Sequence, residues 1–313
     1  MSVYRHQLPQ LRAPLFLTDG GIETSLIYDD GIELVDFAAF ALLDRAEGRA
    51  ALVRYFEAYA AIAVRDSVGI VLETATWRAS PDWAARQGYD IERLVDLNRT
   101  AVDLLVDIRA RYETPATPIV ISGCIGPRGD GYQPDALMSV DEARRYHTMQ
   151  ARTFANSAAD LVTAITMTYP AEAIGIALAA RDAGIPVVIS FTVETDGTLP
   201  TGATLATAIE AVDAATDSYP AYYMVNCAHP THFAGVLRPG AAWTTRIGGI
   251  RANASTMSHA ELDQATELDA GDPIALARSY RELREQLPHL VVLGGCCGTN
   301  YEHIDAISAA CTA

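Results

Sequence analysis

Cysteine is the residue type in this sequence with the clearest chemical potential. Of the five cysteines, Cys296 and Cys297 are adjacent and are flanked by glycines in Gly-Gly-Cys-Cys-Gly. Glycine leaves the backbone free to turn both sulfurs inward. Cys227 can supply a third sulfur, and three thiolates on Zn2+ leave the fourth tetrahedral position open, as in catalytic zinc sites. We therefore predict a zinc site at Cys227, Cys296 and Cys297 with room for a substrate ligand.

Other interpretations of these residues stay open. Free cysteine is often a small buried hydrophobe, and we expect this of Cys124 and Cys311, which have no neighbouring thiol in the sequence. His229 and His232 follow the third cysteine closely and define an alternative mixed Cys/His site, although Pro230 forces an extended turn that directs their side chains apart. A disulfide framework is not expected, because the number of cysteines is odd and the chain shows no export signal.

The composition excludes several classes of function. The formal net charge is −16, and a nucleic-acid surface needs clustered cations, so we expect no nucleic-acid partner. The sequence contains no lysine, which excludes a Schiff base, a pyridoxal phosphate linkage and a P-loop lysine. There is no signal peptide and no apolar run of roughly 20 residues, so we expect a cytoplasmic protein without a membrane partner. A homo-oligomer is left open.

Short apolar runs alternate with longer amphipathic stretches along the whole chain, as in βα units. Strands are predicted at 14–18, 70–73, 119–123, 161–167, 187–191, 221–226, 243–248 and 291–294. Helices are predicted at 49–64, 91–112, 141–156, 171–183, 204–216, 272–287 and 301–310, with a weaker one after His229. Ser139 is expected to cap a helix start and Gly184 to end a helix.

Eight strands with intervening helices predict an α/β fold of the (β/α)8 barrel type, a TIM barrel, in a single domain over residues 1–313. An open doubly wound sheet is the alternative, but Asp-Gly-Gly-Ile-Glu-Thr after the first strand lacks the G-x-G-x-x-G turn of that fold. The longest irregular stretch, residues 124–138, is predicted to be an ordered loop over one mouth of the barrel.

Working residues of such barrels lie at the carboxyl ends of the strands, where most of the unusual polar and thiol groups of this sequence fall. These are Asp19, Gly20, Gly21, Glu23 and Thr24 after the first strand, Glu73, Thr76 and Trp77 around the end of the second, and Asn226 with Cys227 after the sixth. The acids Asp19, Glu23, Glu73 and Glu194 are available for acid–base chemistry, although an isolated acid is more often a helix cap or a solvated side chain.

The order and context of these motifs resemble the zinc-dependent homocysteine S-methyltransferase family. The likeness rests on Asp19-Gly20-Gly21, on Asn226-Cys227 and above all on Gly294-Gly295-Cys296-Cys297-Gly298-Thr299, and it spans almost the whole chain. The segments 123–132 and 189–193 are also similar to segments of this family.

The resemblance implies that Cys227, Cys296 and Cys297 hold zinc, with the thiol of the acceptor as fourth ligand. Asp19, Gly20 and Gly21 would then bind the amino-acid end of homocysteine, and the aromatic face of Trp77 would favour a cationic donor. We expect no cobalamin-binding module after the barrel and therefore a free donor such as S-methylmethionine, S-adenosylmethionine or a betaine. Methyl transfer to homocysteine would form methionine.

The sequence departs from the family pattern at two places. Relatives carry a Glu-Thr pair after the fourth strand, whose Glu holds the amino group of the substrate, whereas this sequence has Ile165 followed by Thr166. The segment Arg251-Ala252-Asn253 also differs from the Pro-Asn pattern of relatives. Either another acid, such as Glu73 or Glu194, binds the amino group, or the acceptor is a different small thiol. A zinc and amino-acid binding protein without catalytic activity is a third hypothesis.

Overall fold

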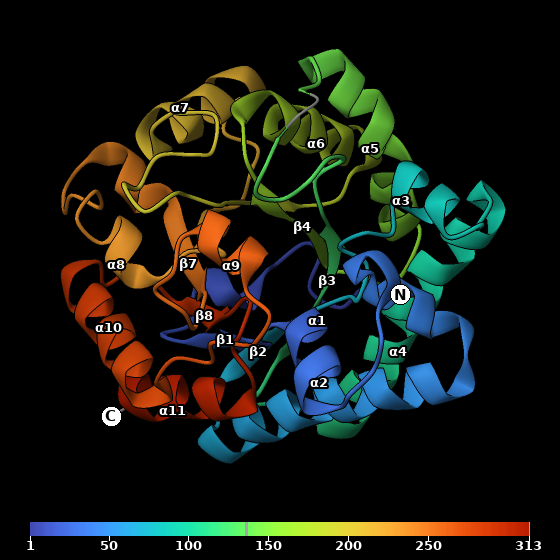
Figure 1. Cartoon of the computed structure of the whole chain (residues 1–313), viewed down its shortest axis with the longest axis horizontal. Coiled ribbons are helices and arrows are strands. Elements are labelled where there is room, and N and C mark those ends of the chain that lie inside the picture. Colours follow the sequence, from blue (N-terminus) through green and yellow to red (C-terminus); the bar gives the residue numbers. More distant parts are fainter. Residues whose placement is uncertain (135–136, 313) are drawn as a thin grey trace.

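The chain folds into a closed barrel of eight parallel strands inside a ring of helices (Figure 1). The structure is a computed structural model, and it describes residues 1–134 and 137–312. Neighbouring strands follow the sequence order, and β8 closes on β1 through the pair Phe16↔Val292. The single-domain (β/α)8 barrel predicted from the alternation of strands and helices is therefore confirmed. The strands are β1 (Phe16–Thr18), β2 (Gly69–Glu73), β3 (Ile119–Ile125), β4 (Leu161–Met167), β5 (Val187–Phe191), β6 (Tyr223–Asn226), β7 (Ile247–Ala252) and β8 (Val292–Gly295).

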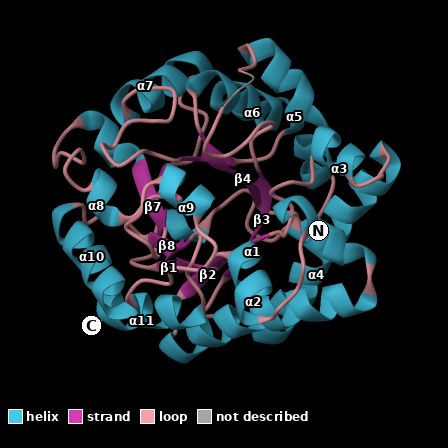
Figure 2. Ribbon diagram, in the orientation of Figure 1, coloured by secondary structure: helices cyan, strands magenta, loops and turns pink. Residues whose placement is uncertain are grey.

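Helices form the outer layer and also cover one mouth of the barrel (Figure 2). Those of the ring include α2 (Ala46–Asp66), α4 (Ile91–Tyr112), α5 (Val140–Ala155), α6 (Pro170–Ala183), α7 (Leu205–Thr216), α10 (Pro273–Gln286) and α11 (Tyr301–Thr312). The shorter ones are α1 (Ile22–Thr24), α3 (Pro81–Arg86), α8 (Pro230–Phe233) and α9 (His259–Gln264). In Figure 1, α1 and α9 lie over the strands rather than in the ring. Segments that follow β1 and β7 therefore reach across the barrel mouth.

Two apolar clusters hold the barrel together. The larger one lies between the outward faces of the strands and the helices, and it includes Leu17, Ile70, Ile121 and Ile189 from the strands. The smaller one fills the interior of the barrel and includes Phe16, Val71, Val120, Leu161, Val188, Met224 and Val292. Because side chains alternate across a strand, residues two positions further along also point inward. At that level six strands contribute polar residues, namely Thr18, Glu73, Ser122, Thr163, Ser190 and Asn226, all of which are buried.

Asp160 anchors the N-terminal segment to the barrel. Its carboxylate accepts hydrogen bonds from the backbone N–H groups of Val3 and Tyr4, both at 2.8 Å, and from that of Ile121 at 3.0 Å. It also forms an ion pair of 2.8 Å with the buried guanidinium of Arg109 on α4. One carboxylate therefore joins the N-terminus, a central strand and a ring helix.

Most predicted elements agree with the structure to within a few residues. The helix 91–112 and the strands 161–167 and 187–191 have the predicted bounds. Ser139 caps α5 in a capping box with Glu142, and Gly184 ends α6 in a left-handed conformation. The weak helix after His229 is α8, which has only four residues. Of the loop predicted at 124–138, residues 135 and 136 lie outside the described residues.

The prediction was wrong for the seventh strand. The segment 243–248 was expected to be a strand, but Ala242–Arg246 is a 3-10 helix and β7 spans Ile247–Ala252. Gly248 and Gly249 lie inside the strand, where a Cβ atom on Gly249 would come within 2.7 Å of the carbonyl oxygen of Val292. Gly249 permits close packing with β8 and Gly248 permits close packing with Tyr222, so these glycines do not end the strand. As a result, Arg251 lies on the strand itself rather than in the following loop.

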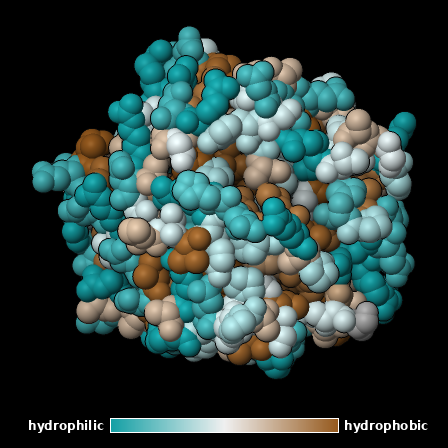
Figure 3. All heavy atoms as spheres, turned by 180° about the vertical axis from the view of Figure 1, so that it is seen from behind, coloured by the Kyte–Doolittle hydropathy of each residue, from teal (hydrophilic) through white to brown (hydrophobic). Residues whose placement is uncertain are grey.

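The side of the molecule turned away from the view of Figure 1 shows hydrophilic residues with smaller hydrophobic groups between them (Figure 3). Among the described helices, none has the length and apolar character that crossing a membrane would require.

Candidate active site

A cavity of about 350 Å³ opens at the carboxyl ends of the strands. Residues in the last part of β2, β3, β4 and β7, and residues that follow β1, β2, β3, β6, β7 and β8, line it, together with Leu262 and Asp263 of α9. The loop after β3 contributes Asp130, Gly131 and Tyr132, so its described part lies over the mouth as predicted. The carboxyl ends of the strands carry the active sites of enzymes with this fold, which makes this cavity the candidate active site.

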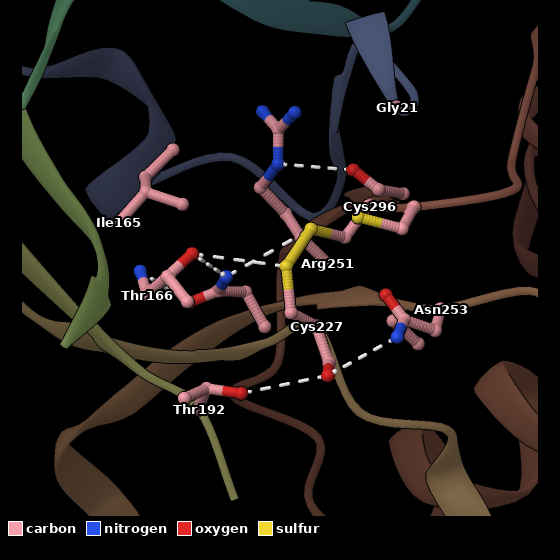
Figure 4. Close-up of a disulfide and its surroundings, with 12 residues drawn as sticks. Gly21, Ile165, Thr166, Thr192, Cys227, Arg251, Asn253 and Cys296 are labelled. Carbon is pink, nitrogen blue, oxygen red and sulfur yellow. Dashed lines mark hydrogen bonds between the residues drawn. A yellow bond between two sulfur atoms is a disulfide. The ribbon is translucent and has the colours of Figure 1, made fainter. Parts of the chain in front are cut away.

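The three predicted sulfur ligands meet in the wall of this cavity. The sulfur atoms of Cys227, Cys296 and Cys297 all lie within 4.8 Å of one another, although Cys227 is 69 residues from Cys296. Within residues 1–134 and 137–312, this is the only group of three His, Cys, Asp or Glu side chains close enough to hold a metal ion. A disulfide joins Cys227 to Cys296, and the thiol of Cys297 is free (Figure 4). The sequence analysis did not predict this disulfide.

Each of the three sulfurs has one polar neighbour that can donate a hydrogen bond. The Tyr132 hydroxyl donates to Cys297 Sγ at 3.5 Å, and the Asn226 amide donates to Cys296 Sγ at 3.8 Å. The Thr166 hydroxyl lies 3.7 Å from Cys227 Sγ. Hydrogen-bond donors favour a sulfur that carries negative charge, as a metal-bound thiolate does. Three clustered sulfurs with such surroundings fit a zinc ion in the reduced state, when the disulfide is open.

Asn226 organises the backbone around Cys227. Its amide oxygen accepts hydrogen bonds from the backbone N–H of Thr166 at 3.0 Å and from the Ser190 hydroxyl at 2.6 Å, while its amide nitrogen donates to Thr166 Oγ1 at 2.9 Å. Thr166 and Cys227 both have positive φ, at 67° and 51°, which is uncommon for residues other than glycine. Buried hydrogen bonds of this kind can hold such backbone conformations at a functional site. Asn226 does not line the cavity, and it contacts Thr166 and Cys296 from within the barrel wall.

The carbonyl group of Cys227 is held from three sides. The ring Nε2 of His259 lies 2.8 Å from this oxygen, the Asn253 amide donates to it at 3.2 Å, and the Thr192 hydroxyl donates to it at 3.4 Å (Figure 4). The other ring nitrogen of His259 lies 3.1 Å from the Glu194 carboxylate. The sixth strand therefore ends in a turn whose sulfur has little freedom to move.

Tyr132 connects the loop after β3 to the cysteine cluster. Besides its hydrogen bond to Cys297, its ring stacks on that of His259 with centroids 4.0 Å apart. Burial raises the pKa of the Tyr132 hydroxyl well above its usual value, so the phenol stays protonated and remains a donor. Burial also raises the pKa of the Cys297 thiol, whereas the hydrogen bond from Tyr132 lowers it. The hydroxyl thus opposes the cost of placing a thiolate in this cavity.

Asp19 and Arg251 form a buried ion pair in the wall of the cavity. Arg251 Nη1 lies 3.0 Å from Asp19 Oδ1, and the guanidinium also donates to the carbonyl oxygens of Gly20 and Gly295, each at 3.1 Å. The Tyr55 hydroxyl donates to the second oxygen of Asp19 at 3.1 Å. Asp19 therefore already has partners for both oxygens, and its main visible effect is to fix the Asp-Gly-Gly turn against β7.

The glycines of that turn are required by close packing. A Cβ atom on Gly21 would come within 2.4 Å of the carbonyl oxygen of Cys296, and one on Gly20 would come within 2.8 Å of the carbonyl oxygen of Thr299. The backbone N–H of Gly21 donates to Thr299 at 2.9 Å. Thr24 completes this contact, because its hydroxyl accepts a hydrogen bond from the backbone N–H of Gly298 at 3.1 Å. The first loop is thus joined directly to the turn that carries the adjacent cysteines.

Glu23 and Glu73 both line the cavity and both have unusual titration behaviour. Burial raises the pKa of each carboxyl to about 7. Glu73 is almost completely buried, and neither of its carboxylate oxygens has a hydrogen-bond partner. Glu23 is partly exposed to the cavity. Both carboxyls are therefore expected to change charge near neutral pH.

The remaining predicted residues of the second strand's loop have different positions. Trp77 lines the cavity, and its indole N–H donates to the carbonyl oxygen of Ile165 at 3.2 Å. Thr76 is fully buried behind the wall and donates to the carbonyl oxygen of Cys124 at 2.7 Å. Ile165 itself lines the cavity, where an apolar side chain cannot bind an ammonium group.

The alternative ligands considered from the sequence lie elsewhere. His229 caps α8 by accepting a hydrogen bond from the backbone N–H of Thr231 at 3.3 Å, and the Nε2 atom of His232 lies 2.9 Å from the carbonyl oxygen of Thr256. Neither joins a group of possible metal ligands in the described part of the chain. Glu194 is paired with His259 and does not line the cavity. Cys124 is buried, as expected of a core cysteine, but it also lines the cavity.

Sequence reasoning missed several residues around the site. Tyr132, His259 and Asn253 contact the cysteine region, yet none has a spacing relative to the cysteines that reveals this. Arg251 and Asn253 were noted at the end of a later strand and as part of a departure from a family pattern, but their contacts were not predicted, and the partner of Arg251, Asp19, is 232 residues away. The polar residues at the strand ends were the one signal that pointed to this region.

The model of the family described as homocysteine S-methyltransferase matches residues 16–311 of the chain. The chain belongs to the homocysteine S-methyltransferase family. Its fold is similar to that of the homocysteine methyltransferase MmuM from Escherichia coli in an oxidized form, with a TM-score of 0.77 and 21% identity over 95% of this chain and 96% of that one. The metallated form of MmuM gives a TM-score of 0.75 with the same identity and coverage. The search of curated proteins found no match.

Membership of this family agrees with the position of the three cysteines in the cavity. The likeness to MmuM extends over nearly the full length of both chains and shows a shared fold. In the structure two of the three sulfurs come from the turn after β8 and the third comes from the end of β6, as the sequence predicted.

Proposed function

We propose that this protein transfers a methyl group from a sulfonium or quaternary ammonium donor to the thiol of L-homocysteine, forming methionine, with zinc held by Cys227, Cys296 and Cys297. The observation that carries this proposal is the meeting of the three sulfurs in one cavity wall. The family assignment supports the reaction class. Bound at these residues, zinc would keep the acceptor thiol deprotonated near neutral pH while its sulfur remains nucleophilic.

The residues of the chain then have separate tasks in this reaction. Tyr132, Asn226 and Thr166 place one donor beside each sulfur of the cluster. The Asp-Gly-Gly turn, fixed by Arg251, brings backbone groups to the same part of the cavity, where we propose that they bind the amino-acid end of the acceptor. The barrel holds these groups rigidly, so the main contribution of the protein is to position donor and acceptor for in-line transfer.

A second candidate keeps the same chemistry but changes the acceptor to another small thiol. Ile165 in the cavity wall favours this alternative, because it offers no charge to an amino group. Glu23 and Glu73 both line the same wall, but the oxygens of Glu73 are enclosed, so Glu23 is the acid that favours homocysteine. The choice of acceptor therefore depends on whether one of these acids takes part in binding.

The test combines metal analysis with a methyl-transfer assay. The protein is purified, reduced, loaded with zinc and incubated with each donor and a panel of thiols, and methylated products are detected by mass spectrometry. We expect one zinc per chain and methionine as product, and both should be lost in Cys297→Ala. The control is Cys311→Ala on α11, which should retain both. Turnover only with thiols other than homocysteine would refute the acceptor, and zinc binding that survives Cys297→Ala would refute the site.

A further inference from the structure

The wall of the cavity carries a large excess of negative charge. Among the described residues it contains seven carboxylate side chains and only two guanidinium groups, those of Arg78 and Arg251. The carboxylates are Asp19, Glu23, Glu73, Asp130, Asp263, Glu267 and Asp269. Both guanidinium groups already face an acid, since Arg251 pairs with Asp19 at 3.0 Å and Arg78 with Asp130 at 3.7 Å. The electrostatic potential of the cavity therefore favours binding of a positively charged ligand over a neutral one.

Most of these acids are engaged by the protein or are out of reach of a guest. Asp269 accepts hydrogen bonds from the Ser255 hydroxyl and the backbone N–H of Gly271, and Asp263 accepts one from Gln133. The oxygens of Glu73 are enclosed and have almost no accessible surface. Glu267 is exposed at the outer end of the cavity.

Glu23 differs from all of these residues. Its side chain keeps part of its surface open to the cavity, and in the described part of the chain it forms no ion pair and no hydrogen bond with another side chain, only one with its own backbone N–H. It is the acid of the inner wall that remains available to a guest.

The position of Glu23 is fixed relative to Cys297. Glu23 lies in α1 between Gly21, whose N–H donates to Thr299, and Thr24, whose hydroxyl accepts from the N–H of Gly298. These two hydrogen bonds join α1 to both sides of the turn that follows Cys297. The carboxylate thus lies beside the cluster and not at a remote part of the cavity.

We propose that Glu23 recognises the positively charged centre of the methyl donor, a sulfonium or quaternary ammonium group, beside the three cysteines. This inference rests on the proposed function, because methyl transfer requires the onium centre to approach the acceptor sulfur, with reacting atoms roughly 3 to 3.5 Å apart. The ring of Tyr132, whose hydroxyl contacts Cys297, and the ring of Trp77 add aromatic surface to the same cavity, and aromatic faces attract onium groups.

The charge balance of the reaction defines what Glu23 can contribute. The acceptor thiolate uses an electron pair to form the new carbon–sulfur bond, while the electrons of the breaking bond stay on the donor sulfur or nitrogen. The thiolate becomes a neutral thioether, and the onium centre becomes neutral as well. The attraction to Glu23 is therefore strongest before transfer and is lost in the product, so it lowers the KM for the donor rather than raising kcat.

The experiment compares each donor with an analogue of the same shape in which an uncharged carbon replaces the onium centre, here called the neutral analogue. S-methylmethionine is paired with 2-amino-5-methylhexanoate, in which a carbon replaces the sulfonium, and glycine betaine is paired with 3,3-dimethylbutanoate. Binding to the reduced, zinc-loaded protein is measured by calorimetry at pH 8, above the pKa of about 7 of Glu23, where its carboxyl is ionised. We expect at least one onium compound to bind about 10-fold more tightly than its neutral analogue.

Glu23→Gln should remove this preference and leave the affinity for the neutral analogue unchanged. With any donor that is turned over, its KM should rise about 10-fold while kcat is unchanged or higher. The matched control is Glu267→Gln, which removes a carboxylate from the outer end of the same cavity and should keep the preference.

Three results would overturn the inference. The first is equal binding of charged and neutral analogues by the unmodified protein, which needs no variant. The second is an onium preference that survives Glu23→Gln. The third is a variant that instead loses discrimination between homocysteine and 4-mercaptobutanoate, which would assign Glu23 to the amino group of the acceptor. An onium preference that depends on Glu23 without any methyl transfer would contradict the proposed function alone, and transfer without that preference would contradict the inference alone.

Discussion

Replacing Glu73 with glutamine is expected to stabilise the protein at alkaline pH. Glu73 is 4% exposed, and neither of its carboxylate oxygens has a hydrogen-bond partner. Burial raises its pKa from 4.5 to about 7, even though Arg251 on the same side of the barrel attracts the charged form and lowers it. The folded protein therefore holds a neutral carboxylic acid more easily than a carboxylate at this position.

The size of the effect follows from the difference between the two pKa values. A rise from 4.5 to about 7 corresponds to about 3 kcal/mol, at roughly 1.4 kcal/mol for each pKa unit. The folded state binds the proton more tightly than the unfolded state, so this contribution to stability is fully present below pH 4.5 and is lost as the pH rises through about 7. Glu73→Gln stays neutral at every pH, and it should therefore gain about 3 kcal/mol relative to the natural protein between pH 5 and pH 8.

Urea unfolding of both proteins at pH 5 and pH 8, followed by circular dichroism, measures this difference. The control is Glu210→Gln, which changes an exposed glutamate on α7 and should shift the unfolding free energy equally at both pH values. The reasoning from burial is wrong if the stability of Glu73→Gln relative to the natural protein is lower at pH 8 than at pH 5. That result would mean that the charged carboxylate of Glu73 stabilises the folded protein.

Three further predictions concern the cysteine cluster and the N-terminal anchor. Tyr132→Phe keeps the ring that stacks on His259 but removes the hydroxyl near Cys297. Zinc affinity, measured against a chromophoric chelator, should therefore fall about 10- to 100-fold. An unchanged affinity would show that the hydroxyl does not support zinc binding. Zinc uptake should require reduction, because the disulfide occupies two of the three sulfurs, and metal analysis that finds equal zinc in oxidised and reduced protein would contradict this. Asp160→Ala leaves Arg109 buried without its partner and should lower the unfolding free energy by about 3 to 5 kcal/mol. A loss below about 1 kcal/mol in urea unfolding would show that the Asp160 carboxylate does not stabilise the fold in this way.

The fold could be predicted from the sequence because the signals that define a barrel are local and repeated. Eight apolar runs separated by amphipathic helices identify βα units without knowledge of any long-range contact. The error at the seventh strand has the opposite origin. Gly248 and Gly249 are read locally as the end of a strand, but Gly249 lies inside it, where the absence of a side chain permits packing against β8. That packing depends on Val292, which is more than 40 residues away and has no signature near the glycines.

The site could be predicted only where its residues form a recognisable local motif in the sequence. Cys296 and Cys297 stand next to each other between glycines, and Cys227 ends a predicted strand, so their meeting could be expected from the fold. Glu194 and Glu23 looked equivalent in the sequence, since both follow strands. The structure separates them, because Glu194 pairs with His259 outside the cavity and Glu23 lines it. Which of the two acids faces a bound ligand therefore depends on the residues that the fold places next to each acid.

The folded structure shows where part of the negative charge of the chain lies. A net charge of −16 argues against nucleic-acid partners but does not indicate where the negative charge lies. In the structure, the arginines of the cavity wall are paired with Asp19 and Asp130, and the carboxylates that remain are not neutralised within the wall. A cationic guest lowers the electrostatic energy of such a wall, whereas a neutral guest of the same shape does not. The cavity should therefore select for the charge of a methyl donor before it selects for its shape.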